Sequence, residues 1–178
     1  FAGSSDQVTQ GGINCVSNFA WAYSTYTTKC LLDPYTHNNQ GARRPIKVNI
    51  PEGSILNARY PAPVNVRHLV GHYVASSVMN ALAPALPDRV IADSGSTPTF
   101  RTLFAGVRHD GLPFSVIIFA NGGMGARPTL DGLPCTPFPT NTQVSSIEVM
   151  ESIAPLLVWK KATRQDSGGH GKFRGGYG

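Results

Sequence analysis

The sequence predicts a mixed α+β fold, with helices and β-hairpins combined in a single domain over residues 1–178. Apolar residues recur at helical spacing in two long stretches, and several short apolar or alternating runs have the length and pattern of strands. A strong hairpin signal, Asp110-Gly111, joins two of these runs. Apolar residues make up 41% of the chain and charged residues only 14%, a balance that favours a folded body over disorder. Helix and strand patterns interleave without repeats, as they do in α+β domains.

The first predicted helix covers residues 14–32. Its apolar and aromatic residues form one stripe, at positions 15, 19, 22, 23, 26 and 30. Asn14 suits the N-cap because its side-chain oxygen can accept a hydrogen bond from an otherwise unpaired backbone N–H. Asp33-Pro34 ends the helix, and a polar loop is expected over residues 36–45.

Two further helices are predicted. The second covers residues 67–86 and also has one apolar face, and Pro84 and Pro87 close it. The third is short and begins near residue 146, where Ser145 and Glu148 have the spacing of a capping box.

The remaining apolar runs predict strands. Residues 46–50 ("IKVNI") alternate between apolar and polar, which is typical of a half-buried strand. Residues 88–99 are expected to begin as a short strand and continue as a loop, and residues 155–164 ("PLLVWKKATR") to form a strand. The hairpin arms are "FRTLFAGV" and "PFSVIIFA". The second arm is apolar on both faces, which predicts a central strand.

The charge and the cysteines exclude several classes of protein. The net charge is +5, and residues 160–178 carry +4 of it, so the rest of the chain is near neutral and no general basic surface is expected. The three cysteines, at positions 15, 30 and 135, match neither a disulfide framework nor a zinc motif. We expect small buried thiols in a reducing compartment, and therefore a cytoplasmic location. No apolar run approaches the ~20 residues of a membrane helix.

The glycine-rich loop at residues 121–131 is the main candidate site. Its glycines are Gly122, Gly123 and Gly125. Because glycines do not block access to backbone N–H groups, we expect them to bind an anion or a substrate. Arg127 offers a planar fork for a carboxylate or phosphate, and Asp131 could orient it or transfer a proton, so both are candidate catalytic residues. Alternatively, Arg127 and Asp131 pair with each other and hold the loop closed.

Two weaker motifs each lack a feature that their chemistry would normally require. His68 and His72 are four residues apart on the second predicted helix, as two ligands of one metal ion would be, but no acidic residue accompanies them. Asp166, Ser167 and His170 include the residue types of a hydrolytic triad, yet triad members usually come from separate elements.

The segment "DSGGHGKFRGGYG" (residues 166–178) has two interpretations. Arg174, with Phe173 and Tyr177 nearby, is typical of a nucleic-acid-binding RGG tail, although such tails normally repeat the motif.

The same segment resembles a signature of the hydantoinase B/oxoprolinase family, in which aspartate-serine-glycine-glycine leads to an aromatic residue and arginine-glycine-glycine. Further blocks resemble that family in the same order: "FAGSSDQVTQGGIN", "HNNQGARRPIKVNIPEGSILNARYPAPV", "GHYVASSVMNALAPALPDRV", "GGMGARPTLDG" and "NTQVSSIEVMESIAP". The resemblance covers essentially the whole chain and favours a folded motif.

The resemblance implies the later half of a hydantoinase B-type subunit in an ATP-dependent cyclic-amide hydrolase, acting on compounds such as hydantoins or 5-oxoproline. The alternatives are a subunit of an ATP-dependent ketone carboxylase of the acetone or acetophenone type, and a non-catalytic scaffold piece. The implied partners are a hydantoinase A-type subunit, which handles ATP, and the remaining half of the hydantoinase B-type subunit. Neither nucleic acid nor a membrane is expected as a partner.

The resemblance also implies ATP and a divalent metal for the whole enzyme. The family's metal motif combines asparagine-aspartate-proline, glycine-threonine-histidine and aspartate, and it has no counterpart in this sequence. No residue of this chain is therefore assigned to ATP or to the metal.

Overall fold

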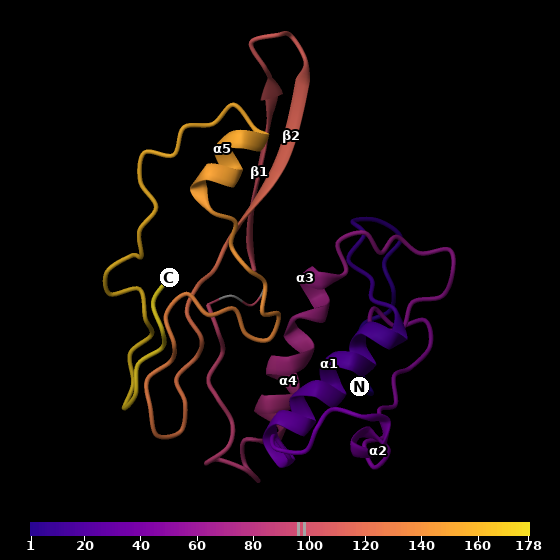
Figure 1. Cartoon of the computed structure of the whole chain (residues 1–178). Helices are drawn as coiled ribbons and strands as arrows, with labels where there is room; N and C mark the ends of the chain where they lie inside the picture. Colours follow the sequence, from indigo (N-terminus) through magenta and orange to yellow (C-terminus); the bar gives the residue numbers. More distant parts are fainter. Residues whose placement is uncertain (96, 98) are drawn as a thin grey trace. The chain divides into compact units, whose positions relative to one another are not determined.

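The computed structural model describes every residue of the chain except 96 and 98 (Figure 1). The chain divides into two compact units, Phe1–Val90 and Ile91–Gly178. The described residues form five helices and one antiparallel two-stranded sheet, which confirms the predicted mixed α+β class. None of these helices is both long and apolar enough to cross a bilayer.

The first unit is helical. Its helices are α1 (Ser17–Leu32), α2 (Gln40–Arg43), α3 (His68–Gly71) and α4 (Tyr73–Leu82). The helix predicted at 67–86 is therefore shorter than expected and is divided at His72. The single turn of α2 lies in the segment predicted to be a loop. Asn39 starts this turn, because its Oδ1 accepts a hydrogen bond from the Ala42 N–H at 2.9 Å.

The buried face of α1 differs from the predicted apolar stripe. Its buried residues are Ala20, Ser24, Thr25, Thr27 and Leu31. Tyr26, which belongs to the predicted stripe, is 44% exposed. Burial of hydroxyl groups is tolerated because each donates to a carbonyl oxygen one turn earlier: Ser24 Oγ to Ala20 O at 2.7 Å, and Thr27 Oγ1 to Tyr23 O at 2.8 Å. Small residues on this face also let α1 pack closely against α4.

The start of α1 also differs from the prediction. The N-cap is Val16, whose side chain makes no capping hydrogen bond. Asn14 is fully buried and bonds elsewhere. Its Oδ1 accepts from the Val8 N–H at 2.8 Å, and its Nδ2 donates to the carbonyl oxygens of Val8 and Pro63 at 2.8 and 3.0 Å. Asn14 therefore joins two loops of the first unit and does not cap the helix.

A small apolar core holds the first unit together. Its buried centre consists of Cys15, Ala20, Leu56 and Val74, with partly buried Phe1, Phe19, Tyr23, Ile50, Ile55 and Val70 around it. Gly71 is required for this packing, because a Cβ atom there would overlap the ring of Phe19. The strand predicted at residues 46–50 does not form. The nearby pairing consists of two isolated bridges, from Ser54 to Asp6 and to Asn57.

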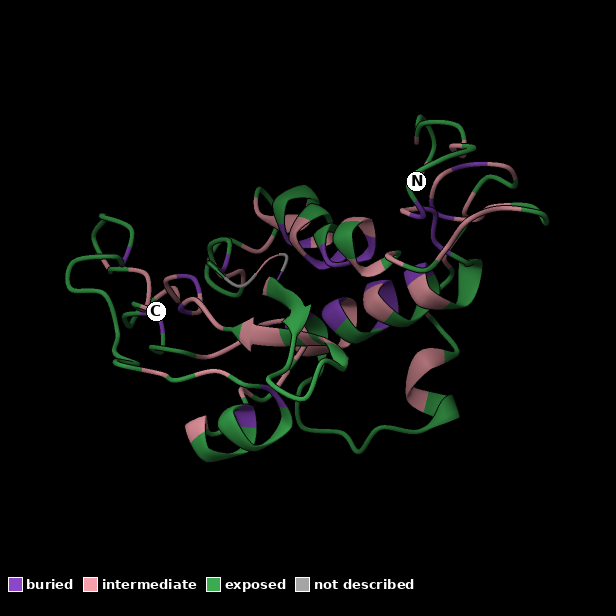
Figure 2. Ribbon diagram, turned by 90° about the horizontal axis from the view of Figure 1, so that it is seen from above, coloured by how far each residue is buried: buried purple, intermediate pink, exposed green. Residues whose placement is uncertain are grey.

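The second unit contains the predicted hairpin. β1 (Phe100–Val107) pairs with β2 (Pro113–Ala120), from Phe100 opposite Ala120 to Val107 opposite Pro113. The predicted turn is confirmed: Gly111 has a φ of +81°, and the Asp110 carboxylate accepts from the Leu112 N–H at 3.1 Å. Among the described residues β2 has one neighbouring strand, so the prediction of a central strand is wrong here. Most positions of the hairpin are exposed (Figure 2).

The third predicted helix is α5 (Ile147–Ile153). Its N-cap is Ser146, whose Oγ accepts from the Val149 N–H, so the predicted capping box of Ser145 and Glu148 is out of register by one residue. Residues 155–164 and 88–95 form no strand, and residues 96 and 98 of the predicted strand-and-loop lie outside the described part. The apolar run that begins the 155–164 segment favours an extended backbone, but a strand also needs a partner.

A candidate cleft in the glycine-rich unit

Four segments of the second unit, at residues 92–95, 122–126, 132–135 and 174–178, contain glycines and exchange backbone hydrogen bonds with one another. These bonds run from Ala92 N to Ala126 O (2.9 Å), Met124 N to Leu133 O (2.9 Å), Gly176 N to Met124 O (2.8 Å) and Cys135 N to Tyr177 O (2.8 Å). Met124 thus bonds to two later segments, one nine residues and the other 52 residues further along the chain. Backbone hydrogen bonds therefore hold these segments together, and few apolar side chains are buried among them.

The glycines of the candidate loop face neighbouring backbone. A Cβ atom on Gly123 would overlap the carbonyl oxygen of Gly176, and one on Gly125 would overlap that of Ala92. The N–H of Gly125 donates to Ser94 Oγ at 3.2 Å. These positions therefore require glycine because the segments approach so closely, a structural reason that applies whether or not a ligand binds.

The terminal segment at residues 166–178 belongs to this arrangement. Gly175 N donates to Gly169 O at 3.0 Å, and Arg164 N donates to Gly178 O at 2.7 Å. The N–H of Gly178 donates to Ser167 Oγ at 3.2 Å. The interpretation as a folded motif is confirmed, since the segment is tied back along its length.

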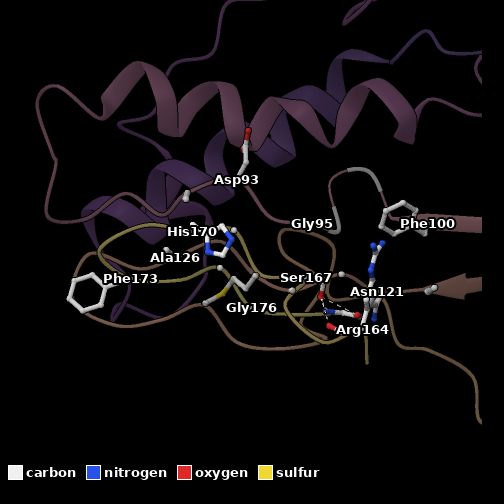
Figure 3. A pocket seen from close by; sticks show the side chains of 18 residues that line it. Asp93, Gly95, Phe100, Asn121, Ala126, Arg164, Ser167, His170, Phe173 and Gly176 are labelled. Carbon is white, nitrogen blue, oxygen red and sulfur yellow. Dashed lines mark hydrogen bonds between the residues drawn. The ribbon is translucent and has the colours of Figure 1, made fainter. Parts of the chain in front are cut away.

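A cleft of about 490 Å³ opens among these segments (Figure 3). The glycines that border it include Gly122 and Gly123. Its other lining residues include Asp93, Phe100, Asn121, Met124, Arg164, Ser167, His170 and Phe173. Apolar rings, hydrogen-bonding groups and exposed backbone thus meet in one cleft. Such a mixture suits a small ligand that has both apolar and polar parts.

Arg127 and Asp131 are close together but do not form an ion pair. The Nε and Nη2 atoms of Arg127 donate to the backbone oxygen of Asp131 at 2.9 and 2.8 Å. The Asp131 carboxylate accepts from the Arg174 N–H at 2.8 Å. Neither side chain borders the cleft described above; Asp131 borders a neighbouring cleft of about 470 Å³ together with Asp166 and Arg174. The two residues hold the loop closed and attach it to the terminal segment.

The other motifs do not assemble into sites. Ser167 Oγ donates to Arg164 O at 2.8 Å, and Arg174 lies between Asp166 and His170, at 3.4 Å from the carboxylate and 3.5 Å from the ring nitrogen. The side-chain bonds of Ser167 and His170 thus lead to different partners, and no triad forms.

No metal site is formed by the residues that the structure describes. In the first unit, His68 and His72 have ring centroids 5.9 Å apart. Nowhere in the described chain do three His, Cys, Asp or Glu residues meet as a metal site would require.

Sequence reasoning placed Asn121 at the start of the candidate loop without giving it a role, and it missed Ser94, which supports the loop. Asn121 directly follows β2, and its Nδ2 donates to Thr142 O at 2.9 Å, which fixes the end of the strand. Ser94 accepts from the candidate loop although it lies about thirty residues earlier in the chain. The position of Asn121 at a strand end was a readable signal, whereas no local pattern could have brought Ser94 to the loop.

Several known proteins that resemble this chain take their names from cyclic amides. The family model described as Hydantoinase B/oxoprolinase matches residues 1–178. A candidate D-/L-hydantoinase subunit of Pseudomonas sp. (strain NS671) is 33% identical over 183 residues, covering 99% of this chain and 30% of that protein. The β subunit of the caprolactamase of Pseudomonas jessenii is 33% identical over 147 residues, covering 79% of this chain and 25% of that protein.

A solved structure shares the fold. The crystal structure of the ATP-dependent caprolactamase from Pseudomonas jessenii matches with a TM-score of 0.82 and 28% identity, over 98% of this chain and 31% of that chain. The present chain thus spans about a third or less of the length of these relatives. With a family model matched from its first residue to its last, the chain belongs to the hydantoinase B/oxoprolinase family.

Proposed function

We propose that this chain forms part of one subunit of an ATP-dependent cyclic-amide hydrolase of the hydantoinase or 5-oxoprolinase type. The observation that carries the proposal is the likeness to the ATP-dependent caprolactamase, which extends over 98% of the chain. The relatives named above take their names from cyclic amides, a hydantoin and a lactam. They give no corresponding support to a ketone carboxylase.

The proposed partners are a hydantoinase A-type subunit and the remainder of a hydantoinase B-type subunit, in the cytoplasm and without nucleic acid or membrane. ATP on the partner would supply the phosphoryl group that makes an amide carbonyl carbon electrophilic. The described residues offer no fitting set of metal ligands, so no step of the reaction is assigned to a metal held by this chain.

Within this chain we propose that the cleft and the loop at residues 121–131 form the functional region. Gly122 and Gly123 expose backbone to the cleft, and Gly125 anchors the loop from behind through Ser94. Arg127 and Asp131, the candidate catalytic pair, would act on this region by fixing the shape of the loop. The two bonds from the Arg127 guanidinium to Asp131 O support that role.

The proposal is tested by replacing Arg127 with alanine in the whole enzyme. ATP hydrolysis that depends on a cyclic amide, such as a hydantoin, 5-oxoproline or a lactam, is measured with and without the chain. Arg127→Ala should lower this coupled activity at least ten-fold and leave the melting temperature nearly unchanged, because the residue is partly exposed and its loss removes two hydrogen bonds that are exposed to solvent.

Arg108→Ala is the matched control. Arg108 lies in the hairpin turn of the same unit and makes an exposed ion pair with Asp110 at 3.8 Å, which contributes little to stability. Equal activity of the two variants would remove Arg127 from the functional region. Unfolding of the Arg127→Ala protein would show that the residue is structural, and activity that does not depend on the chain would make the chain a scaffold piece.

A further inference from the structure

The segment at residues 157–163 is extended and pairs with no strand among the described residues. Among the described residues, none exchanges a backbone hydrogen bond with the N–H or C=O groups of residues 159–163. Alternate side chains point outward, with Leu157 71% and Trp159 92% exposed. A buried or paired strand is where such apolar side chains are normally found.

Two side-chain contacts hold the start and middle of this segment beside α5. The Glu151 carboxylate accepts from the Val158 N–H at 2.8 Å, and Lys161 Nζ donates to Ser145 O at 3.0 Å. The segment is thus held in place while its remaining backbone groups are open to a partner.

The hairpin β1–β2 has the same property. It is a two-stranded sheet, and no backbone group of another described residue bonds to its outer edges. Leu103, Val107 and Ile117 are 62%, 69% and 52% exposed. An isolated hairpin of this kind is marginally stable in water, and long apolar edges are normally covered in native proteins.

A large groove lies between these two incomplete elements. Its volume is about 970 Å³, and its lining includes Phe104 and Ile118 of the hairpin, Met150 of α5, and Val158, Lys160 and Ala162. All of these residues belong to the second unit. The groove therefore has an apolar floor and an extended backbone with free hydrogen-bonding groups along one wall, which are the features that strand addition requires.

We propose that an extended segment from the remainder of a full-length hydantoinase B-type subunit occupies this groove and pairs with residues 157–163. The inference rests on the proposed function in one respect, namely that this chain works within a longer subunit. The solved caprolactamase chain favours that occupant, because it contains this fold over 98% of the present chain while more than two thirds of its own length lies outside the match. Pairing would also explain why residues 155–164 have the sequence pattern of a strand.

Amide hydrogen exchange tests the proposal. Exchange is measured for the 178-residue chain and for the same residues within a full-length subunit. Alternate amides within residues 159–163, those whose N–H groups face the partner strand, should exchange at least 100-fold more slowly in the full-length subunit, because each is hydrogen-bonded there. The hairpin turn at residues 108–112 is the internal control and should exchange equally in both. Equal exchange at 159–163 would overturn the proposal.

A pair of variants separates strand pairing from simple burial. Ala162→Pro removes one N–H and should abolish the protection of neighbouring amides in the full-length subunit, whereas Ala162→Ser should retain it. Retained protection in the proline variant would overturn pairing at this segment.

Light scattering of the 178-residue chain addresses a different occupant. A dimer with slow exchange at residues 159–163 would assign the groove to a second copy and overturn the proposal, and a monomer with fast exchange is expected. Cyclic-amide-dependent ATP hydrolysis is a separate readout. Protection without that activity would contradict the proposed function and leave the strand pairing intact.

Discussion

The two units of this chain are stabilised in different ways. The first unit, Phe1–Val90, has a compact apolar core in which Cys15, Ala20 and Val74 are at most 3% exposed. Among the described residues of the second unit, Ile91–Gly178, the buried hydrophobic residues are Met150 and Ala154, and glycine-rich segments joined by backbone hydrogen bonds take the place of a core.

This difference has consequences for function. Hydrogen bonds contribute little net free energy to folding compared with apolar burial, so the second unit should depend more on what surrounds it. The cleft, the glycine loop and the open groove all belong to that unit. The second unit, which contains the candidate binding features, is thus the unit with the smaller apolar core.

The largest expected effect comes from adding a methyl group where the glycine segments meet. In Gly125→Ala the new Cβ would overlap the backbone oxygen of Ala92, which cannot move aside as a side chain would. We expect a loss of about 3 kcal/mol of unfolding free energy in the second unit. Urea unfolding followed by amide exchange would locate the loss, with α1 and α4 remaining protected.

Gly169→Ala is the control for this substitution. A Cβ on Gly169 would meet nothing within 4 Å, so its effect should stay within about 0.5 kcal/mol. If the two alanine variants were equally stable, backbone packing would not be what stabilises the second unit.

The next largest effect concerns Asn14 in the first unit. In Asn14→Ser the shorter side chain cannot make all three bonds to Val8 and Pro63, which leaves partly buried backbone groups unpaired and costs about 2 kcal/mol. Thermal unfolding measured by circular dichroism would detect it. Asn39→Ser is the matched control, because Asn39 is a true N-cap and serine caps about as well. Equal tolerance of both changes would show that the bonds of Asn14 to Val8 and Pro63 do not stabilise the first unit.

The comparison of the units also shows what the sequence could predict. The hairpin was predictable because Asp110-Gly111 and its flanking runs are local signals, and the long helices because their apolar spacing is regular. The buried face of α1 was not, since hydroxyl groups such as that of Thr27 are buried by bonding to their own helix. The prediction of a strand at 155–164 was wrong because strand pairing depends on a partner that is distant in the sequence.

The candidate site was predictable to a similar extent. The loop at residues 121–131 was recognisable from its glycines, but its neighbours were not, because Ser94 and the 174–178 segment reach it through tertiary contacts. The bond between the Arg127 guanidinium and the Asp131 backbone oxygen could not be predicted either, because the sequence shows which side chains are charged but not which carbonyl groups lie near them.

A smaller effect is expected at the start of α5 in the second unit. Ser146→Ala removes the hydroxyl that accepts from the Val149 N–H and should lower the unfolding free energy by about 1 kcal/mol. Ser145→Ala should be nearly neutral, because Ser145 contributes its backbone oxygen to Lys161 and alanine retains that oxygen. If Ser145→Ala proved the more harmful of the two, the capping box predicted from the sequence would be correct.

The smallest effect should appear only at alkaline pH and only in the first unit. Burial raises the pKa of the Cys15 thiol from 9.0 to about 11, although the charge of Arg67 and the Gly71 backbone partly oppose the rise. The folded state therefore holds the proton more tightly than the unfolded state, so the stabilisation is complete below pH 9 and is lost as the pH rises toward 11. The linked loss between pH 8 and pH 9.5 is on the order of 1 kcal/mol. Cys15→Ser removes this ionisation and can keep a hydrogen bond to Arg67 O, which the thiol makes at 3.2 Å, so its stability should fall less over that interval.

Cys135, in the second unit, is exposed, and Cys135→Ser is the control, which should follow the wild-type pH profile. Parallel profiles for all three proteins, measured by urea unfolding at each pH, would show that burial of Cys15 does not contribute to the stability of the first unit in this way.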